Sequence, residues 1–508
     1  MYIKRREFIK LSGITMAGSV FIPPLLQSCG RVPLSNDASG YLEHFEVTAE
    51  QLQKVILTAM SKGADYADLF FEHTKSNTAS LQDNKVNSAL SNIRYGVGIR
   101  VLKGEQTGFA YAENTSLEAM LQAAKTAANI ADSNASITEF PVKEFQPPSF
   151  YSIVSPWEEI SIKDKVPFIS SLNEKIFAGD KRVTKVNISL NDTTTYILFY
   201  NSDGLLTWDY RPLTYLTART IMEENGRIEN LSISRSYRKG FEFLTDDLVD
   251  GIAKESIEQT SLLFKAGRPK GGEMEIVMGP GRSGILLHEA MGHSFEADFN
   301  RKKTSIFSDK MGKKIGEEFV TIYDDGTLPN DRGALNIDDE GNPGEKTVLV
   351  SKGVLTSYIH DRISAKYYNV KPTGNGRRQD FRNVPIPRMR STYMENGPHS
   401  KDEIIASVKK GIYVDNFSNG QVNIGPGDFT FFVKFGYLIE NGKLTDAIKD
   451  VNIIGNGPQA LADITMVGND LQFSDSTWNC GKDGQSVPVT LGMPTVKIKK
   501  LTVGGLSA

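Results

Sequence analysis

The sequence is poor in cysteine and histidine, with two cysteines and six histidines in 508 residues. Two cysteines cannot build the disulfide framework of a small secreted scaffold. Charged residues make up 23% of the chain and the net charge is only −3, which excludes a typical nucleic-acid-binding surface. Low-complexity tracts are absent and 39% of the residues are hydrophobic, which excludes a largely disordered chain and a membrane protein with many spans. The composition is that of a globular protein long enough for two or three domains.

Residues 1–28 predict an export signal that precedes the fold. The segment has a basic start, an apolar run too short to span a bilayer, and small residues before Cys29. Residues 5–10, RREFIK, resemble a twin-arginine signal, and residues 26–29, LQSC, resemble a lipoprotein cleavage site. We therefore expect an exported protein, either periplasmic or anchored to a membrane by a lipid on Cys29. Gln27 is less usual at such a cleavage site, and export without acylation is the alternative.

Three segments that mix helices and strands are expected after the signal. Residues 45–150 form an N-terminal α+β domain, residues 151–268 a central α+β region, and residues 269–508 a C-terminal β-rich domain. Because the strands are grouped and not separated by helices, antiparallel sheets fit better than βαβ units. The predicted fold class is α+β, with an N-terminal α/β sandwich-like region followed by a large β-rich domain that carries the histidine-containing helix described below.

Local signals place several elements within these segments. Thr48 and Gln51 form a capping box before an amphipathic helix, and Thr115 is expected to cap a second helix. The dipeptides at 203–204, 225–226 and 441–442 are Asp-Gly or Asn-Gly, which is typical of tight β-hairpin turns.

Residues 285–299, ILLHEAMGHSFEADF, contain two histidines five positions apart. A regular α-helix turns about 100° per residue, so His288 and His293 would diverge by about 140° and could not share one ion. One inserted residue, a π-bulge, would return both to the same side. Gly292 is the natural place for the deformation because it lacks a β-carbon. The spacing therefore predicts a helix that is bulged or broken between Ala290 and His293.

The residues around these histidines fit a metal hydrolase. Glu289, next to His288, is placed to act as a general base toward a water molecule on the metal. The alternative is an amphipathic helix with incidental histidines. Cys480 has no cysteine partner once Cys29 is set aside, and from the residues alone it is either a buried small hydrophobe or a metal-bound thiolate.

Other motifs say less about the function of the protein. The glycines at 279, 281 and 284 match a dinucleotide-binding fingerprint, but no parallel βαβ core surrounds them, so a tight strand-to-helix turn is favoured. The acidic loops at 323–327 and 338–345 lack the spacing of an EF-hand, and turns are favoured there over calcium sites.

Five ordered blocks resemble the TldD/PmbA metallopeptidase family: LLHEAMGHSFEADFNRK, IYDDGTLPNDRG, PTGNGRR, MVGNDL and CGKDGQSVPV. The resemblance implies that His288, His293 and Cys480 bind Zn²⁺ and that Glu289 serves catalysis. Glu296 and Asp298 compete as third ligands, and we interpret them as residues that orient the histidines.

The same resemblance implies a zinc metallopeptidase that hydrolyses unfolded or flexible peptides in a chamber enclosed by a dimer. We expect a homodimer, or an assembly with a PmbA-like partner that lacks the motif. Familiar members are cytosolic, so the export signal departs from the family. The alternatives are a non-hydrolytic peptide-binding protein with a structural zinc site, closed by Glu296 or Asp298, and a zinc amidase acting on a non-peptide amide. Residues 372–378 and 390–394 are candidates to line the cleft, and for residues 372–378 structural turns are the alternative.

Overall fold

A computed structural model describes residues 37–82, 84–133, 140–423 and 426–505. The predicted export signal at 1–28 and the predicted lipid anchor Cys29 lie outside the described residues. Among the helices within these ranges, none has the length and apolar character that a membrane span needs. The chain is α+β with a large β-rich C-terminal region, as predicted.

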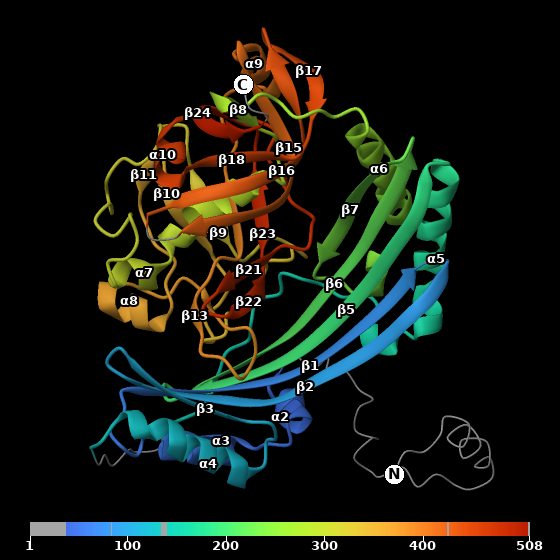
Figure 1. Cartoon of the computed structure of the whole chain (residues 1–508). Coiled ribbons are helices and arrows are strands. Elements are labelled where there is room, and N and C mark those ends of the chain that lie inside the picture. The colour runs from blue at the N-terminus through green and yellow to red at the C-terminus, as the bar shows by residue number, and fades with distance from the viewer. Residues whose placement is uncertain (1–36, 83, 134–139, 424–425, 506–508) are drawn as a thin grey trace, which may run out of the picture. The chain divides into compact units, whose positions relative to one another are not determined.

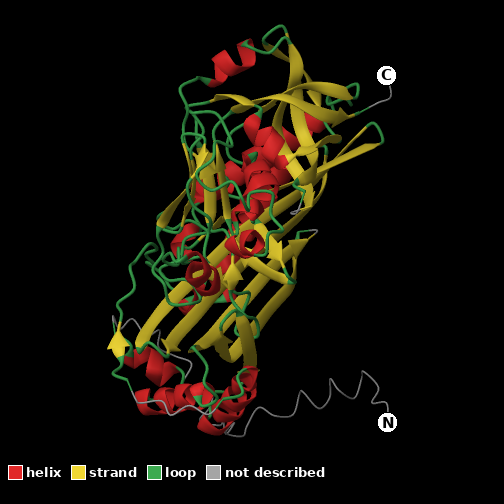
Figure 2. Cartoon of the chain, turned by 90° about the vertical axis from the view of Figure 1, so that its left-hand side faces the viewer, coloured by secondary structure: helices red, strands yellow, loops and turns green. Residues whose placement is uncertain are grey.

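The N-terminal half is built on one long antiparallel sheet (Figure 1). Its strand order is β3-β2-β1-β5-β6, with β7 and the short β4 also paired to β6. The strands are β1 (Tyr66–Gln82), β2 (Lys85–Lys103), β3 (Gln106–Ala112), β4 (Lys143–Glu144), β5 (Val183–Asn201), β6 (Leu205–Glu224) and β7 (Arg227–Tyr237). Seen after a 90° turn, the long strands lie side by side (Figure 2). Strand β1 precedes residues 145–150 in the chain and β5 follows them. The two strands pair with each other, so one sheet includes both of the predicted segments.

Helices pack on this sheet, and the C-terminal region lies against its concave face (Figure 1). The helices of the N-terminal half are α2 (Ser39–His44), α3 (Ala49–Met60), α4 (Leu117–Ala127), α5 (Ile162–Gly179) and α6 (Asp246–Leu263). The predicted capping box is confirmed, since the side chains of Thr48 and Gln51 each accept a backbone N–H of the other. The prediction for α4 is wrong by one residue. Ser116, in extended conformation directly before the helix, accepts the Ala119 N–H, while Thr115 lies buried against Tyr95.

Two of the predicted hairpin turns are confirmed by their backbone conformation, which lies in the left-handed region. Asn225 and Gly226, between β6 and β7, have φ values of 52° and 77°. Asn441 and Gly442, between β16 and β17, have φ values of 51° and 76°. Two successive positive φ angles make the turn whose twist matches that of the flanking strands, and asparagine and glycine reach them at low cost.

Two sheets form most of the C-terminal region. In the first, the order β15-β8-β24-β18-β16 closes because β15 also pairs with β16, and β17 and β19 attach to the ring. Its strands are β8 (Gly272–Met278), β15 (Lys410–Asn423), β16 (Asp428–Glu440), β17 (Lys443–Ile448), β18 (Val451–Asn456), β19 (Ile464–Val467) and β24 (Val496–Gly504). Closure leaves the ring strands without a free edge.

The second sheet has the order β11-β10-β9-β14-β23-β20. Its strands are β9 (Ile322–Asp325), β10 (Lys346–Ser351), β11 (Val354–Leu355), β14 (Ser391–Met394), β20 (Gln472–Phe473) and β23 (Thr490–Met493). Shorter elements complete the region: α7 (Ala297–Arg301), α8 (Arg362–Tyr368), α9 (Lys401–Ala406), α10 (Gly457–Ala462), β12 (Gly376–Arg377), β13 (Ile386–Pro387), β21 (Asn479–Lys482) and β22 (Gln485–Pro488). Strand β14 is buried between β9 and β23, so residues 390–394 belong to the core, and the prediction that they line the cleft is wrong.

Buried ion pairs join the N-terminal sheet to the C-terminal region. Arg100 on β2 is fully buried and binds Asp68 on β1 and, with an Nη1–Oε1 distance of 2.6 Å, Glu340. Arg211 on β6 binds Asp339, with an Nη1–Oδ1 distance of 2.6 Å. The acidic loop at 338–345 is thus a turn whose carboxylates pair with arginines of the sheet, as favoured from the sequence.

Replacing Arg100 tests this junction. In Arg100→Leu the buried carboxylates of Asp68 and Glu340 lose the guanidinium that both of them bind, which costs roughly 3–5 kcal/mol of stability. We expect the midpoint of urea unfolding to fall accordingly. The control is Lys103→Leu on the same strand, which removes an exposed pair with Asp65 worth less than about 1 kcal/mol. If Arg100→Leu and the control unfold at the same urea concentration, the buried ion pairs of Arg100 do not stabilise the junction.

Candidate metal centre

The histidine-containing segment does not wind as a regular α-helix. Residues Leu286–Met291 form a π-helix, η5, and residues Gly292–Phe295 continue as a 3-10 helix, η6. The predicted deformation between Ala290 and His293 is therefore confirmed. A π-turn adds a residue to the helical repeat, which brings side chains five apart onto one side. The rings of His288 and His293 face each other with centroids 5.2 Å apart.

Gly292 has a different role from the one expected. Its φ of −60° and ψ of −47° are ordinary helical values, so the backbone freedom of glycine is not used. A β-carbon at this position would instead lie 2.2 Å from Met389 Sδ. The glycine lets the core side chain of Met389 approach the helix at the point where its winding changes.

The third donor comes from a distant hairpin. Cys480 lies on β21, which pairs with β22, and its Sγ is 3.5 Å from His293 Nε2. One donor atom from each of His288, His293 and Cys480 lies within 4.8 Å of the others, and all three side chains are buried. Two imidazoles and a thiolate are donors that Zn²⁺ prefers, and zinc bond lengths place tetrahedral sulfur and nitrogen ligands about 3.6 Å apart. The chemistry and spacing of these donors fit a zinc ion.

The surroundings of His288 give an independent indication that it binds a ligand. It is 2% exposed, and among the described residues neither of its ring nitrogens has a hydrogen-bond partner. Buried polar groups in folded proteins almost always have a partner, because desolvation without a compensating bond is costly. A metal ion held on one ring nitrogen accounts for the burial of this imidazole.

A buried charged network supports His293. Its Nδ1–H donates to Glu296 Oε2 at 2.9 Å, which leaves Nε2 directed toward Cys480. Lys482 Nζ lies 3.1 Å from Glu296 Oε2 and 2.7 Å from Asp298 Oδ1. Burial raises the pKa of Glu296, but the charges of Lys482 and His293 outweigh burial and lower this pKa to about 2. The carboxylate therefore stays ionised and fixes the ring orientation, an arrangement common around zinc-binding histidines.

The positions of Glu296 and Asp298 bear on the competing ligand sets. Neither carboxylate belongs to the cluster of His288, His293 and Cys480. Both are instead bonded to Lys482, and Glu296 also to the far side of the His293 ring. This placement agrees with residues that orient the histidines and not with residues that bind the ion directly.

The surroundings also favour a thiolate at Cys480. Burial raises the pKa of this thiol, but the charges of His293 and His288 lower it well below its ordinary value. Arg388 donates a hydrogen bond to the Cys480 carbonyl oxygen and holds the strand in place. A thiolate is the form of cysteine that binds metals.

Glu289 differs from the donors in its access to solvent. Its side chain is 22% exposed, whereas that of His293 is 3% exposed, and its Oε2 lies 3.8 Å from His293 Nε2. A carboxylate at this distance from the donors can accept a proton from a water molecule held beside them.

Lys482 and Arg388 were not identified from the sequence. Lys482 had a usable signal, because residues two apart on a strand share a face and Lys482 follows Cys480 by two. Arg388 had none, since its contact with the Cys480 carbonyl joins segments 92 residues apart.

Three family models match the chain. They describe PmbA/TldA metallopeptidase domain 1 at residues 67–131, the central domain at 155–264 and the C-terminal domain at 271–505. A metalloprotease TldD homolog of Haemophilus influenzae is 39% identical over 93% of this chain and 99% of its own length. A zinc metalloprotease TldD homolog of Saccharolobus solfataricus is 29% identical, covering 89% and 99%. The crystal structure of TldE from Thermococcus kodakarensis superposes with a TM-score of 0.71 at 21% identity, covering 90% and 100%.

Glu296→Gln tests the support of His293. The amide keeps the shape of the side chain but loses the charge that orients the ring, so metal affinity should fall by roughly 10- to 100-fold. Competition with a chromophoric chelator measures the affinity, and the exposed Glu318→Gln is the control. Unchanged affinity would show that Glu296 does not support the site, and loss of the bound ion altogether would identify it as a direct ligand.

Proposed function

The chain belongs to the PmbA/TldD metallopeptidase family, and we propose that it is a zinc peptidase that cleaves unfolded or flexible peptides. The observation that carries the proposal is the meeting of His288, His293 and Cys480, from two distant segments, with the more exposed Glu289 beside them. The relative from Saccharolobus solfataricus, which carries zinc in its name, supports the identity of the metal.

His288, His293 and Cys480 would hold the ion. When bound, zinc supplies a Lewis acid that polarises the scissile carbonyl and lowers the pKa of a water molecule. Cys480 donates more negative charge than a third imidazole would, and we infer that water activation is weaker here than in a three-histidine site.

Glu289 carries the proton through the reaction. Its carboxylate accepts a proton from the attacking water as the new carbon–oxygen bond forms. The same proton then passes to the amide nitrogen as the carbon–nitrogen bond breaks, so the amine leaves neutral and the carboxylate is regenerated. Glu296 and Lys482 take no part in proton transfer; they hold the His293 ring while the charge at the site changes.

The cellular setting extends the proposal. We infer a homodimer, or an assembly with a PmbA-like partner, that encloses the site in a chamber and admits only flexible peptides. The signals at residues 5–10 and 26–29 support export, with the protein periplasmic or anchored through Cys29. Twin-arginine export carries folded proteins, so zinc can be loaded before translocation, which would protect the thiolate from oxidation.

Glu289→Gln separates catalysis from metal binding. The amide cannot accept the proton, so cleavage of an unfolded peptide should fall by roughly 10²- to 10⁴-fold while one zinc ion per chain is retained. Mass spectrometry of the products and metal analysis of the same sample measure the two properties, with Glu318→Gln as the control.

Cleavage by Glu289→Gln at the wild-type rate would rule out Glu289 as the base. A zinc-loaded wild type that binds peptide without cleaving it would favour the non-hydrolytic alternative. Cleavage confined to non-peptide amides would favour an amidase.

A further inference from the structure

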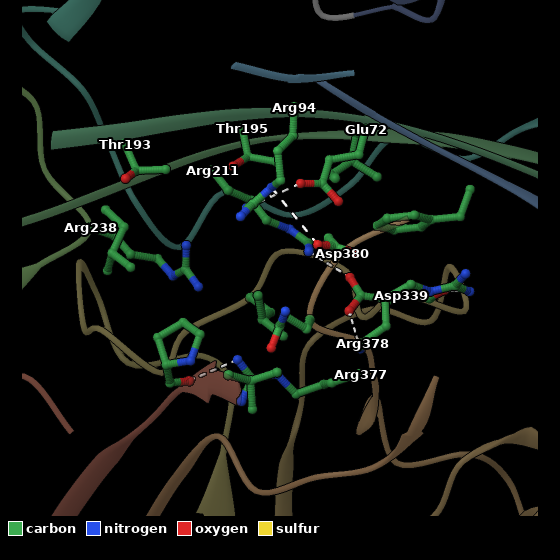
Figure 3. Close-up of a pocket in the computed structure, with 17 residues that line it drawn as sticks. Glu72, Arg94, Thr193, Thr195, Arg211, Arg238, Asp339, Arg377, Arg378 and Asp380 are labelled. Carbon is green, nitrogen blue, oxygen red and sulfur yellow. Dashed lines mark hydrogen bonds and ion pairs between the residues drawn. The ribbon is translucent and has the colours of Figure 1, made fainter. Parts of the chain in front are cut away.

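A cavity of about 140 Å³ with several charged residues in its lining lies between the N-terminal sheet and the C-terminal region. Strands β1, β5 and β6 contribute to one wall, and residues 377–380 and strand β22 to the other. Arginines dominate its charged lining (Figure 3). The arginines are Arg94, Arg211, Arg238, Arg377 and Arg378, and the acids are Glu72, Asp339 and Asp380.

The acids account for only part of this positive charge. Arg94 lies 3.5 Å from Glu72 and 4.0 Å from Asp380. Arg211 pairs with Asp339. The remaining paired arginine, Arg378, lies 3.6 Å from Asp68 outside the cavity lining. Arg238 and Arg377 are the two arginines of the lining that remain to be accounted for.

Neither of these two arginines pairs with a carboxylate of the described residues, and each is only 3% exposed. Arg238 donates one hydrogen bond, to the Pro212 carbonyl at 3.2 Å, and its Cζ lies 5.4 Å from the centre of the Tyr151 ring. Its Nε has no hydrogen-bond partner within the described chain. Figure 3 shows its guanidinium directed into the space between the lining groups. Among the described residues, the Arg377 guanidinium donates only to the backbone carbonyls of Met389 and Pro488. Burial lowers the pKa of Arg238, and it lowers that of Arg377 to about 9, which reflects the cost of holding both charges there.

The cavity shares a hairpin with the metal donors. Val487 and Pro488 line the cavity from β22, and Val487 is the direct strand partner of Cys480 on β21. Arg377 also binds the carbonyl of Met389, whose side chain packs against Gly292. A ligand in the cavity would therefore contact β22, the strand that pairs with β21 and with Cys480 on it.

We propose that this cavity binds a carboxylate group of the peptide substrate, with Arg238 and Arg377 as its counter-charges. The inference rests on the proposed function for the identity of the substrate. A carboxylate accepts the parallel N–H bonds that a guanidinium offers and supplies the missing negative charge. The volume suits one such group on a short stem and not a length of peptide. The source is either the C-terminal carboxylate or an aspartate or glutamate side chain.

Binding of N-acetylglycine to the zinc-loaded full chain tests the site without any cleavage. N-acetylglycinamide is the neutral probe, Arg238→Met removes the unpaired charge, and Arg219→Met removes an exposed arginine as the control. We expect N-acetylglycine to raise the Tm of wild type and Arg219→Met, and to bind Arg238→Met roughly 10- to 100-fold more weakly by calorimetry. Without ligand, Arg238→Met should melt no lower than wild type, because the substitution removes a buried unpaired charge.

The metal donors are intact in all of these proteins, so the difference between them isolates the cavity. Failure of N-acetylglycine to bind wild type, or equal binding to Arg238→Met, overturns the proposal. Should Arg238→Met not fold, Arg377→Met gives the same comparison from the opposite wall.

Matched peptides then identify the source of the carboxylate. One pair differs in a free or amidated C-terminus, and the other in an internal glutamate or glutamine. Removing the recognised carboxylate should raise KM roughly 10- to 100-fold in wild type and leave KM of Arg238→Met unchanged. Equal KM values across both pairs would overturn the assignment to substrate. A protein that binds N-acetylglycine through Arg238 but cleaves nothing would refute the peptidase and keep the carboxylate site.

Discussion

The approach of Cys480 to His293 is the contact on which the site depends. It joins a distorted helix to a hairpin 187 residues further along the chain, and it places a sulfur 3.5 Å from an imidazole nitrogen in a fully buried setting. His288 is buried at the same place, and neither of its ring nitrogens has a hydrogen-bond partner in the described residues. Burial of an imidazole with no partner is costly unless a ligand satisfies it. A metal ion held by the three donors would do so, and the π-winding of η5 is the local distortion that brings both histidines to one side.

Buried charge is arranged in two ways in this protein. Around the metal donors and at the junction of the two halves the networks are closed. Each charge there has a partner of opposite sign: Lys482 lies between Glu296 and Asp298, and Arg100 lies between Asp68 and Glu340. Such networks hold side chains in one geometry because breaking any pair leaves an isolated charge in a medium of low dielectric constant.

Beside the β21–β22 hairpin, which carries Cys480, two buried arginines lack a carboxylate partner among the described residues. Arg238 and Arg377 are as deeply buried as the closed networks but face a cavity instead of a carboxylate. The contrast separates two roles for the same chemistry. A charge with its partner in the chain stabilises the fold, and a charge that lacks one stores part of the free energy that a ligand can recover on binding.

Predictions from the sequence succeeded where the physics is local. The capping box at Thr48 and the left-handed turns at Asn225 and Asn441 depend on neighbouring residues only. The deformation before His293 also followed, because in a regular helix two histidines five residues apart cannot share one ion. Predictions failed where neighbours compete or distant segments decide. Thr115 and Ser116 are both capable caps, and burial of Thr115 against Tyr95 settles which one is used. Residues 391–394 form a core strand because β9 and β23 cover them, which no local pattern reveals.

The sequence by itself determined the unusual spacing of the histidines, and its resemblance to a known family added Cys480 as a distant third donor. The tertiary structure alone decided that Glu296 orients His293 through its Nδ1 and that Lys482 and Arg388 belong to the site. It also decided that two arginines line a cavity without a carboxylate partner among the described residues. The reason is the range of the interactions. Backbone geometry and spacing act over a few residues and are written in the chain, whereas the burial that sets the strength of a charge exists only after segments far apart have met.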